Sequence, residues 1–270
     1  MKHTRDFKTI KVEVDGPLGR LTLNRPERLN AIGATMLQEL AEAAHWFDTH
    51  HELRVVIMSG AGRSFSAGAD LHDSPAAGAL PGTGNSWLHR REIGQLGLRA
   101  SDALEQMHAI TIAQVHGHAV GGGVVLVAVC DLRVAAEDAS FFIPEIELGI
   151  PLAWGGIPKL VREIGPALTK ELVITCRRFS PEEAKAIGFV NRVVPAAKLQ
   201  AEVEALAQQI IAMPAVPVTI TKEHVNAITR TMGAGITAFA DGDVLLGTFN
   251  DEESRNAARA YMQKTFRKKS

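Results

Sequence analysis

The sequence has little of several features that would mark a particular class of protein. It holds two cysteines among 270 residues, both in apolar surroundings, which indicates buried reduced thiols and excludes a disulfide framework. The formal net charge is −1, so no overall basic field attracts nucleic acid or an anionic membrane. No apolar run reaches the roughly 18 residues that span a bilayer, and the charged first residues are not followed by the apolar segment of a signal peptide. We therefore expect a cytoplasmic protein with no membrane or nucleic-acid partner.

Two common glycine motifs are also missing. No segment matches G-x-x-x-x-G-K-[ST], which excludes a Walker-type phosphate loop, and no G-x-G-x-x-G opens a helical pattern, so a Rossmann site is not supported. His116 and His118 lie two residues apart in a strand-like segment, without a cysteine or acidic partner at ligand spacing. We therefore expect no metal site.

The patterns that are present indicate an α/β protein. Strand patterns alternate with helical ones, as expected for a mostly parallel sheet covered by helices. The strand patterns cover residues 10–14, 18–23, 54–59, 109–115, 131–135 and 141–143, and the helical ones 36–47, 93–107 and 124–130. Beyond about residue 197 the pattern is almost wholly helical, over 198–213, 218–229, 236–248 and 252–265. The sequence thus predicts a core over 1–197 and a helical region over 198–270.

Two glycine-containing turns stand out along the chain. One runs from Gly60 to Leu71 after a strand, and the other from His116 to Gly123, between a strand and an apolar helix. Glycine lets the backbone approach a ligand closely, and a helix N-terminus offers unpaired N–H groups. Two such N–H groups can converge on a developing oxyanion. The alternative is that both are tight turns that only pack well.

A third segment, from Ile143 to Pro151, carries a carboxylate in apolar surroundings. Burial there would raise the pKa of Glu145 toward that of a base that removes a carbon-bound proton. A capped or salt-bridged glutamate is the alternative. Glu147 follows two residues later and, in an extended segment, would point the other way.

Together these segments resemble the crotonase superfamily, the enoyl-CoA hydratase/isomerase family. The resemblance rests on Phe65-Ser66-Ala67-Gly68-Ala69-Asp70-Leu71, then Gly121-Gly122-Gly123, then Pro144-Glu145, in that order. It implies a crotonase-like spiral of repeated ββα units and C-terminal helices that build a homotrimer or a dimer of trimers. It also implies an acyl-CoA substrate, with no cofactor apart from the coenzyme A that belongs to that substrate.

The resemblance further implies roles for individual residues. The oxyanion-hole N–H groups fall on Ala69 and Gly122. The Arg28–Leu29 turn and Ala67, with Asp70, Leu71 and Gly121, fall on substrate or CoA contacts. Tyr261 and Lys264 match a C-terminal aromatic and lysine that reach a neighbour's CoA. That match offers the basic tail, from Lys264 to Lys269, a use beyond solvation.

One departure from the family pattern decides the expected reaction. Hydratases carry two glutamates, and at the first of these positions this chain has Val125, which cannot position water. A 1,3 double-bond shift needs one base, so the resemblance is closer to the Δ3,Δ2-enoyl-CoA isomerases, with Glu145 as single acid/base. Dienoyl-CoA isomerases carry an aspartate where this chain has Ala153, so we do not expect that activity. Trp154 adds bulk that fits a drier acyl pocket, or it is plain core packing.

The acyl pocket and the reaction class stay open to alternatives. The Gly/Pro-rich loop from His72 to Ser86 and the following Trp87 are expected to shape the pocket. An enoyl-CoA hydratase with an atypical site remains an alternative, as does a thioester hydrolase. Ser64-Phe65-Ser66-Ala67-Gly68 looks like an imperfect nucleophile elbow, although no helix follows it. A non-catalytic acyl-CoA binder is the third alternative.

Overall fold

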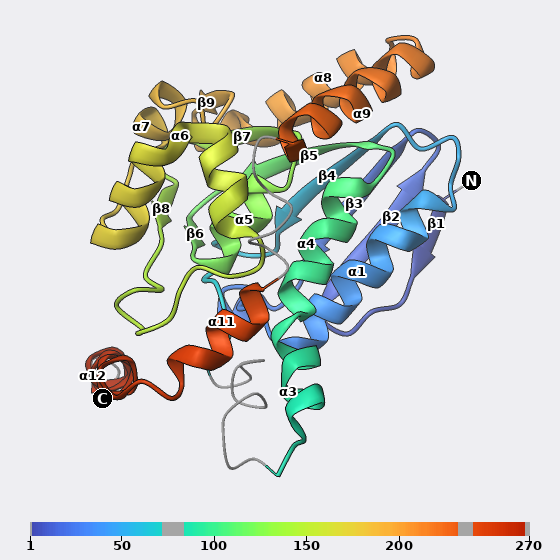
Figure 1. The fold of residues 1–270 in the computed structure, drawn as a ribbon. Helices are drawn as coiled ribbons and strands as arrows, with labels where there is room; N and C mark the ends of the chain where they lie inside the picture. Colours follow the sequence, from blue (N-terminus) through green and yellow to red (C-terminus); the bar gives the residue numbers. More distant parts are fainter. Residues whose placement is uncertain (1, 72–83, 232–239, 268–270) are drawn as a thin grey trace.

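A seven-stranded sheet organises the chain in the computed structural model, which describes residues 2–71, 84–231 and 240–267 (Figure 1). Its strands, in spatial order, are β1 (Lys2–Arg5), β2 (Ile10–Asp15), β3 (Leu18–Leu23), β4 (Val55–Gly60), β5 (Ile110–Val115), β7 (Leu132–Ala136) and β9 (Arg192–Val194). The first three pair antiparallel, and every pair from β3 to β9 is parallel. The α/β prediction is confirmed.

A second, smaller sheet lies beside the first. Strands β6 (His118–Val120) and β8 (Ser140–Phe142) pair parallel, and single bridges join Ser66 to Ala119 and Ile32 to Ala69. Successive passes of the chain therefore place one strand in the large sheet and one short extended segment in the small one. This is the expected ββα spiral. The loop after β4 joins the small sheet through the bridge from Ser66 to Ala119.

Helices cover both faces of the large sheet, so its central strands are buried on both sides. Val56 and Met58 of β4 join the cluster that contains α1 (Ala34–Asp48) and α4 (Leu96–Gln106). Val55 and Ile57 join the cluster on the opposite face, which α8 (Leu199–Ile211) covers. Successive side chains of β4 therefore point to opposite faces of the sheet, and each face contributes to a separate hydrophobic cluster.

The remaining helices complete the chain. They are α3 (Trp87–Gly94), α5 (Gly122–Ala128), α6 (Gly156–Thr175), α7 (Pro181–Ala186), α9 (Ala215–Thr231), α11 (Asp241–Thr248) and α12 (Glu252–Arg267). The single helix predicted over 93–107 is two, with Gln95 at the junction between α3 and α4. Helix α6 was not predicted. Gly165, at φ 78°, and Pro166 interrupt its pattern midway.

The predicted boundary at residue 197 falls between the last strand and the first helix of the C-terminal region. That helix, α8, packs on the large sheet, whereas α11 lies against α3 (Figure 1). No single helix in the described ranges is long and apolar enough to cross a bilayer. The bent pair Ala196–Ile211 and Ala215–Thr231, at 108°, meets that test only when taken together.

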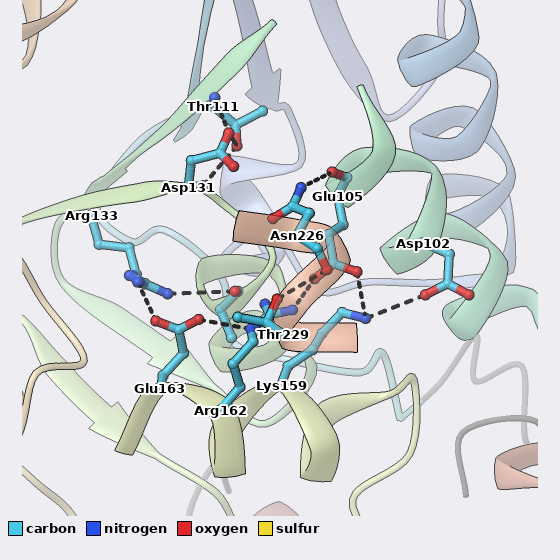
Figure 2. A network of polar contacts seen from close by, with 11 residues as sticks. Asp102, Glu105, Thr111, Asp131, Arg133, Lys159, Arg162, Glu163, Asn226 and Thr229 are labelled. Carbon is cyan, nitrogen blue, oxygen red and sulfur yellow. Dashed lines mark hydrogen bonds and ion pairs between the residues drawn. The ribbon is translucent and has the colours of Figure 1, made fainter. Parts of the chain in front are cut away.

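An ionic network ties α4 to α6 in the interior (Figure 2). Lys159 lies 3.3 Å from Asp102 and 3.5 Å from Glu105, and Arg162 lies 2.6 Å from Glu105. Burial opposes the ionisation of Glu105, but the charges of Lys159 and Arg162 outweigh it and lower the pKa of that carboxyl. Glu163 extends the network to Arg133 of β7, at 2.6 Å. The two helices are therefore held at a fixed spacing.

Candidate active site

A buried asparagine fixes the loop that carries the first predicted N–H donor. Asn30 has no exposed surface and adopts a left-handed φ of 54°, which asparagine tolerates better than most residues. Its amide donates to the carbonyls of Ala61 and Ser64 at 2.9 and 2.8 Å, and its Oδ1 accepts from the N–H of Arg25 at 2.9 Å. The turn after β3 is thereby tied to the loop after β4.

The two glycine-containing turns lie side by side. Ser66 donates its N–H to His118 and accepts from Val120, at 2.9 and 3.0 Å. A Cβ at Gly68 would lie 2.5 Å from the Val120 carbonyl, so only glycine fits there at its φ of 83°. Among the described residues, no acceptor is recorded for the N–H of Ala69 or of Gly122, the first residue of α5. This geometry suits two convergent donors.

Glu145 lies directly against this pair of turns. A Cβ at Gly121 would lie 2.3 Å from Glu145 Oε1, so the absence of a side chain there makes room for the carboxylate. Glu145 is 8% exposed, and its Oε2 is buried without a hydrogen-bond partner in the described part of the chain. Burial raises the pKa of Glu145 to about 7, against a smaller opposing effect of its own backbone N–H. A carboxyl with such a pKa can accept and return a proton near neutrality.

The segment after Glu145 differs from the expected extended strand. Residues 145–149 form a turn, so the argument from strand alternation does not apply to Glu147. Glu147 is nevertheless exposed, and it does not line the cavity that holds Glu145. The turn, not strand alternation, therefore places Glu147 at the surface while Glu145 is buried.

A small apolar cavity joins these elements. It has a volume of about 60 Å³, and Glu145 is the one ionisable side chain among the described residues that line it. Its walls include Ala69, Gly122, Val125, Trp154 and Leu245. Val125 is fully buried and offers only methyl groups at the position where the hydratase pattern has a second carboxylate. The described lining of the cavity thus combines one buried carboxyl group, the two predicted donor residues and apolar walls.

The residues predicted to contact CoA form a connected patch next to this cavity. Asp70 is 2% exposed and pairs with both Arg25 and Arg28, at 2.9 and 3.0 Å. Ala67 donates its N–H to the carbonyl of Leu29 at 2.8 Å. Asp70 therefore orients the arginines, which leaves Arg28, itself 37% exposed, as the charge that can face a ligand. Leu71 is half-buried at the end of this loop.

Three predicted residues lie apart from the cavity. Trp87, at the start of α3, is 54% exposed and does not line it. Tyr261, on α12, is half-buried, and burial, with the nearby charge of Glu147, raises its pKa. Lys264 is exposed one turn further along α12. Residues 72–83 of the predicted loop lie outside the described residues.

Sequence reasoning missed one contribution to the cavity, that of α11. Leu245 comes from α11, about 100 residues after Glu145. The helix that follows the predicted loop, α3, does reach the cavity, but through Ile93 and Gly94 at its end and not through Trp87. Helix α11 is held there by Asp241, whose Oδ2 accepts the N–H of Gly155 at 2.7 Å. A helix at this distance in the chain carries no local pattern that links it to the site.

Ser66, the candidate nucleophile of the hydrolase alternative, is committed to the scaffold. It is fully buried, its hydroxyl donates to the carbonyl of Asn30 at 2.8 Å, and it accepts from the N–H of Gly68 at 3.1 Å. No histidine contact is recorded for this hydroxyl within the described ranges. Ser66 therefore shapes the loop that presents Ala69.

A larger hollow, of about 580 Å³, lies elsewhere, beneath α9. Its charged side chains all take part in ion pairs, as Lys222 does with Asp131 at 2.8 Å. None of the residues predicted for the site lines it. The chemistry is therefore assigned to the small cavity.

A spiral α/β fold that places two glycine-containing turns beside a buried carboxylate is typical of enzymes that act on acyl-CoA thioesters. The family described as enoyl-CoA hydratase/isomerase matches residues 13–268, and the chain belongs to it. A short-chain-enoyl-CoA hydratase of Clostridium acetobutylicum is 32% identical over 262 residues, which cover 96% of each chain. A peroxisomal Delta(3,5)-Delta(2,4)-dienoyl-CoA isomerase of Arabidopsis thaliana is 35% identical over 198 residues, covering 72% of this chain and 71% of that protein.

The solved structures agree with this assignment. An enoyl-CoA hydratase/isomerase from Mycobacterium paratuberculosis superposes with a TM-score of 0.83 at 27% identity, covering 95% of this chain and all of that one. An enoyl-CoA hydratase subunit from Geobacillus kaustophilus is 30% identical, with a TM-score of 0.75, and covers 96% of this chain and 97% of that one. Most of these relatives are named hydratases, whereas the described residues that line this cavity include a single carboxylate.

Proposed function

We propose that this enzyme shifts the double bond of a 3-enoyl-CoA to the 2-position, with Glu145 as its single acid/base. The observation that supports this is the composition of the cavity. Glu145 is the one ionisable group among its described lining residues, and Val125 fills the second carboxylate position with a buried apolar side chain. Hydration needs an activated water as well as a proton at C2, whereas a 1,3 shift needs only one proton carrier.

The proposed steps use the residues around the cavity. The thioester oxygen accepts hydrogen bonds from the N–H groups of Ala69 and Gly122, which stabilise negative charge on that oxygen. Glu145 removes the proton at C2, and the C2–H electrons delocalise as a dienolate that extends from the thioester oxygen through C1, C2 and C3 to C4. The carboxyl then delivers its proton to C4, and the double bond settles between C2 and C3. Proton count and charge are unchanged, and no cofactor takes part.

The substrate side of the proposal uses the patch next to the cavity. Arg28 and the Leu29 turn, together with Ala67, would hold the CoA moiety, and Tyr261 and Lys264 would contribute from α12. We extend the proposal to a cytoplasmic homotrimer or dimer of trimers, in line with the family resemblance. Coenzyme A remains part of the substrate, and no further cofactor is proposed.

A parallel assay tests the reaction. Purified enzyme is given a 3-enoyl-CoA and, separately, a 2-enoyl-CoA, and products are separated chromatographically. We expect conversion of the 3-enoyl substrate, no hydration of the 2-enoyl one, and loss of activity by at least about 100-fold in Glu145→Gln, since general acid–base catalysis contributes about 10²–10⁴-fold. Below pH 7, kcat/KM should fall as Glu145 becomes protonated.

Glu147→Gln is the matched control, because it removes an exposed carboxylate two residues away. This variant should keep wild-type activity. Robust hydration of the 2-enoyl substrate by wild type would overturn the isomerase proposal in favour of an atypical hydratase. Release of free CoA would indicate thioester hydrolysis. Binding without any turnover would indicate a non-catalytic acyl-CoA binder.

A further inference from the structure

Trp154 occupies a slot between two glycines of different helices. A Cβ at Gly122, on α5, would lie 2.1 Å from Trp154 Cζ3, and a Cβ at Gly97, on α4, would lie 2.0 Å from its Cδ1. No side chain fits at either position while the indole is there. The indole therefore bridges from the predicted N–H donor to α4 and forms one wall of the cavity.

The backbone and the neighbouring helices hold this side chain in place. Trp154 has a left-handed φ of 61°, an uncommon conformation for a bulky residue that the surroundings must maintain. Asp241 accepts the N–H of the next residue, Gly155, at 2.7 Å. Helix α6 begins at Gly156, and the ionic network of Figure 2 ties it through Lys159 to α4. The slot and its occupant thus form one rigid unit.

The volume left by the indole is small. The cavity measures about 60 Å³. Pockets for larger ligands measure about 300–1,000 Å³. A thioester whose C1 carbonyl faces Ala69 and Gly122 therefore finds room for a short acyl group before it meets the indole and Leu245.

We propose that Trp154 is the residue that sets acyl chain length, and that the substrates are short-chain acyl-CoA thioesters. The inference rests on the proposed function only in taking this cavity as the acyl site. It does not depend on which reaction Glu145 performs.

Binding of unreactive thioesters tests the wall without turnover. Butanoyl-, octanoyl- and dodecanoyl-CoA are titrated calorimetrically into wild type, Trp154→Ala and Trp154→Leu. A buried methylene contributes about 0.8 kcal/mol, which is roughly fourfold in affinity. Wild type should bind the two longer thioesters no more than about threefold tighter than butanoyl-CoA. The variants should gain at least tenfold from butanoyl- to octanoyl-CoA, because the chain can enter the vacated slot.

Ile174→Ala is the control, since it trims an exposed apolar side chain on α6 outside the cavity, and it should reproduce the wild-type profile. Trp154→Leu keeps part of the packing should Trp154→Ala fail to fold. A tenfold gain with length in wild type, or the same length profile in a folded Trp154 variant, would overturn the proposal. A length limit that moves in the variants supports it even when the 3-enoyl assay shows no isomerisation, so the two proposals fail separately.

Discussion

Replacing the buried carboxylate of Glu145 should make the folded protein more stable. Burial holds the pKa of Glu145 at about 7 in the native state, against a usual value of 4.5. A raised carboxyl pKa means that folding penalises the charged form. The penalty is absent below pH 4.5, where the group is neutral in both states, and complete above pH 7. The difference of about 2.5 pKa units corresponds to about 3 kcal/mol of destabilisation at pH 8.

Glu145→Gln removes this penalty and keeps the shape of the side chain. Integrated over the two pKa values, the stability advantage of the variant should grow by about 2.5 kcal/mol between pH 5 and pH 8. Urea denaturation of both proteins at the two pH values measures this change, and taking the difference between pH values cancels any fixed cost of burying the amide. Glu147→Gln, at an exposed position, should show no such trend. An advantage that is equal at pH 5 and pH 8, or that falls, would refute the assignment of Glu145 as a desolvated, poised base.

Three further substitutions probe the scaffold of the site. Gly121→Ala should lower kcat/KM by about 100-fold or more while the protein stays folded, because its Cβ would lie 2.3 Å from Glu145 Oε1 and displace the base; steady-state kinetics and circular dichroism measure the two effects. Ser66→Ala should cost about 1–3 kcal/mol in urea unfolding but less than tenfold in kcat, whereas total loss of activity would revive the nucleophile interpretation. Glu105→Gln should destabilise by about 3 kcal/mol at pH 7, because it removes the buried carboxylate that Lys159 and Arg162 share. Since the pKa of Glu105 is lowered, that difference should shrink as pH falls below its usual 4.5; equal stability at pH 7 would contradict the network.

The sequence predicted the parts of this site that depend on local chain geometry. A glycine that must approach a carbonyl, as Gly68 does, and a helix that starts at Gly122 both leave a local signature. Glu145 also has a local signature, because its apolar neighbours in the sequence predict that it is buried. The spiral fold then brings these three locally predicted residues together at one site.

The parts that were missed depend on contacts between distant segments or on interrupted patterns. Leu245 reaches the cavity from α11 because Asp241 caps Gly155, a contact between residues 86 positions apart. Helix α6 was missed because Gly165 and Pro166 usually end helices, yet the structure continues after a break. Asn30 was not singled out from the sequence, because the carbonyls that its buried amide binds lie more than 30 residues further along the chain.

The position of Glu145 has a consequence for the fate of one hydrogen atom. The carboxyl is 8% exposed and shares its cavity with no other described ionisable side chain, so a proton it removes has few exchange partners before it is returned. A single base also contacts only one face of the planar dienolate. The proposed isomerisation should therefore carry deuterium from C2 of a labelled 3-enoyl-CoA to C4 of the product, on the same face. The hydrogen at C4 of the product would then be the one removed from C2, not one taken from the solvent.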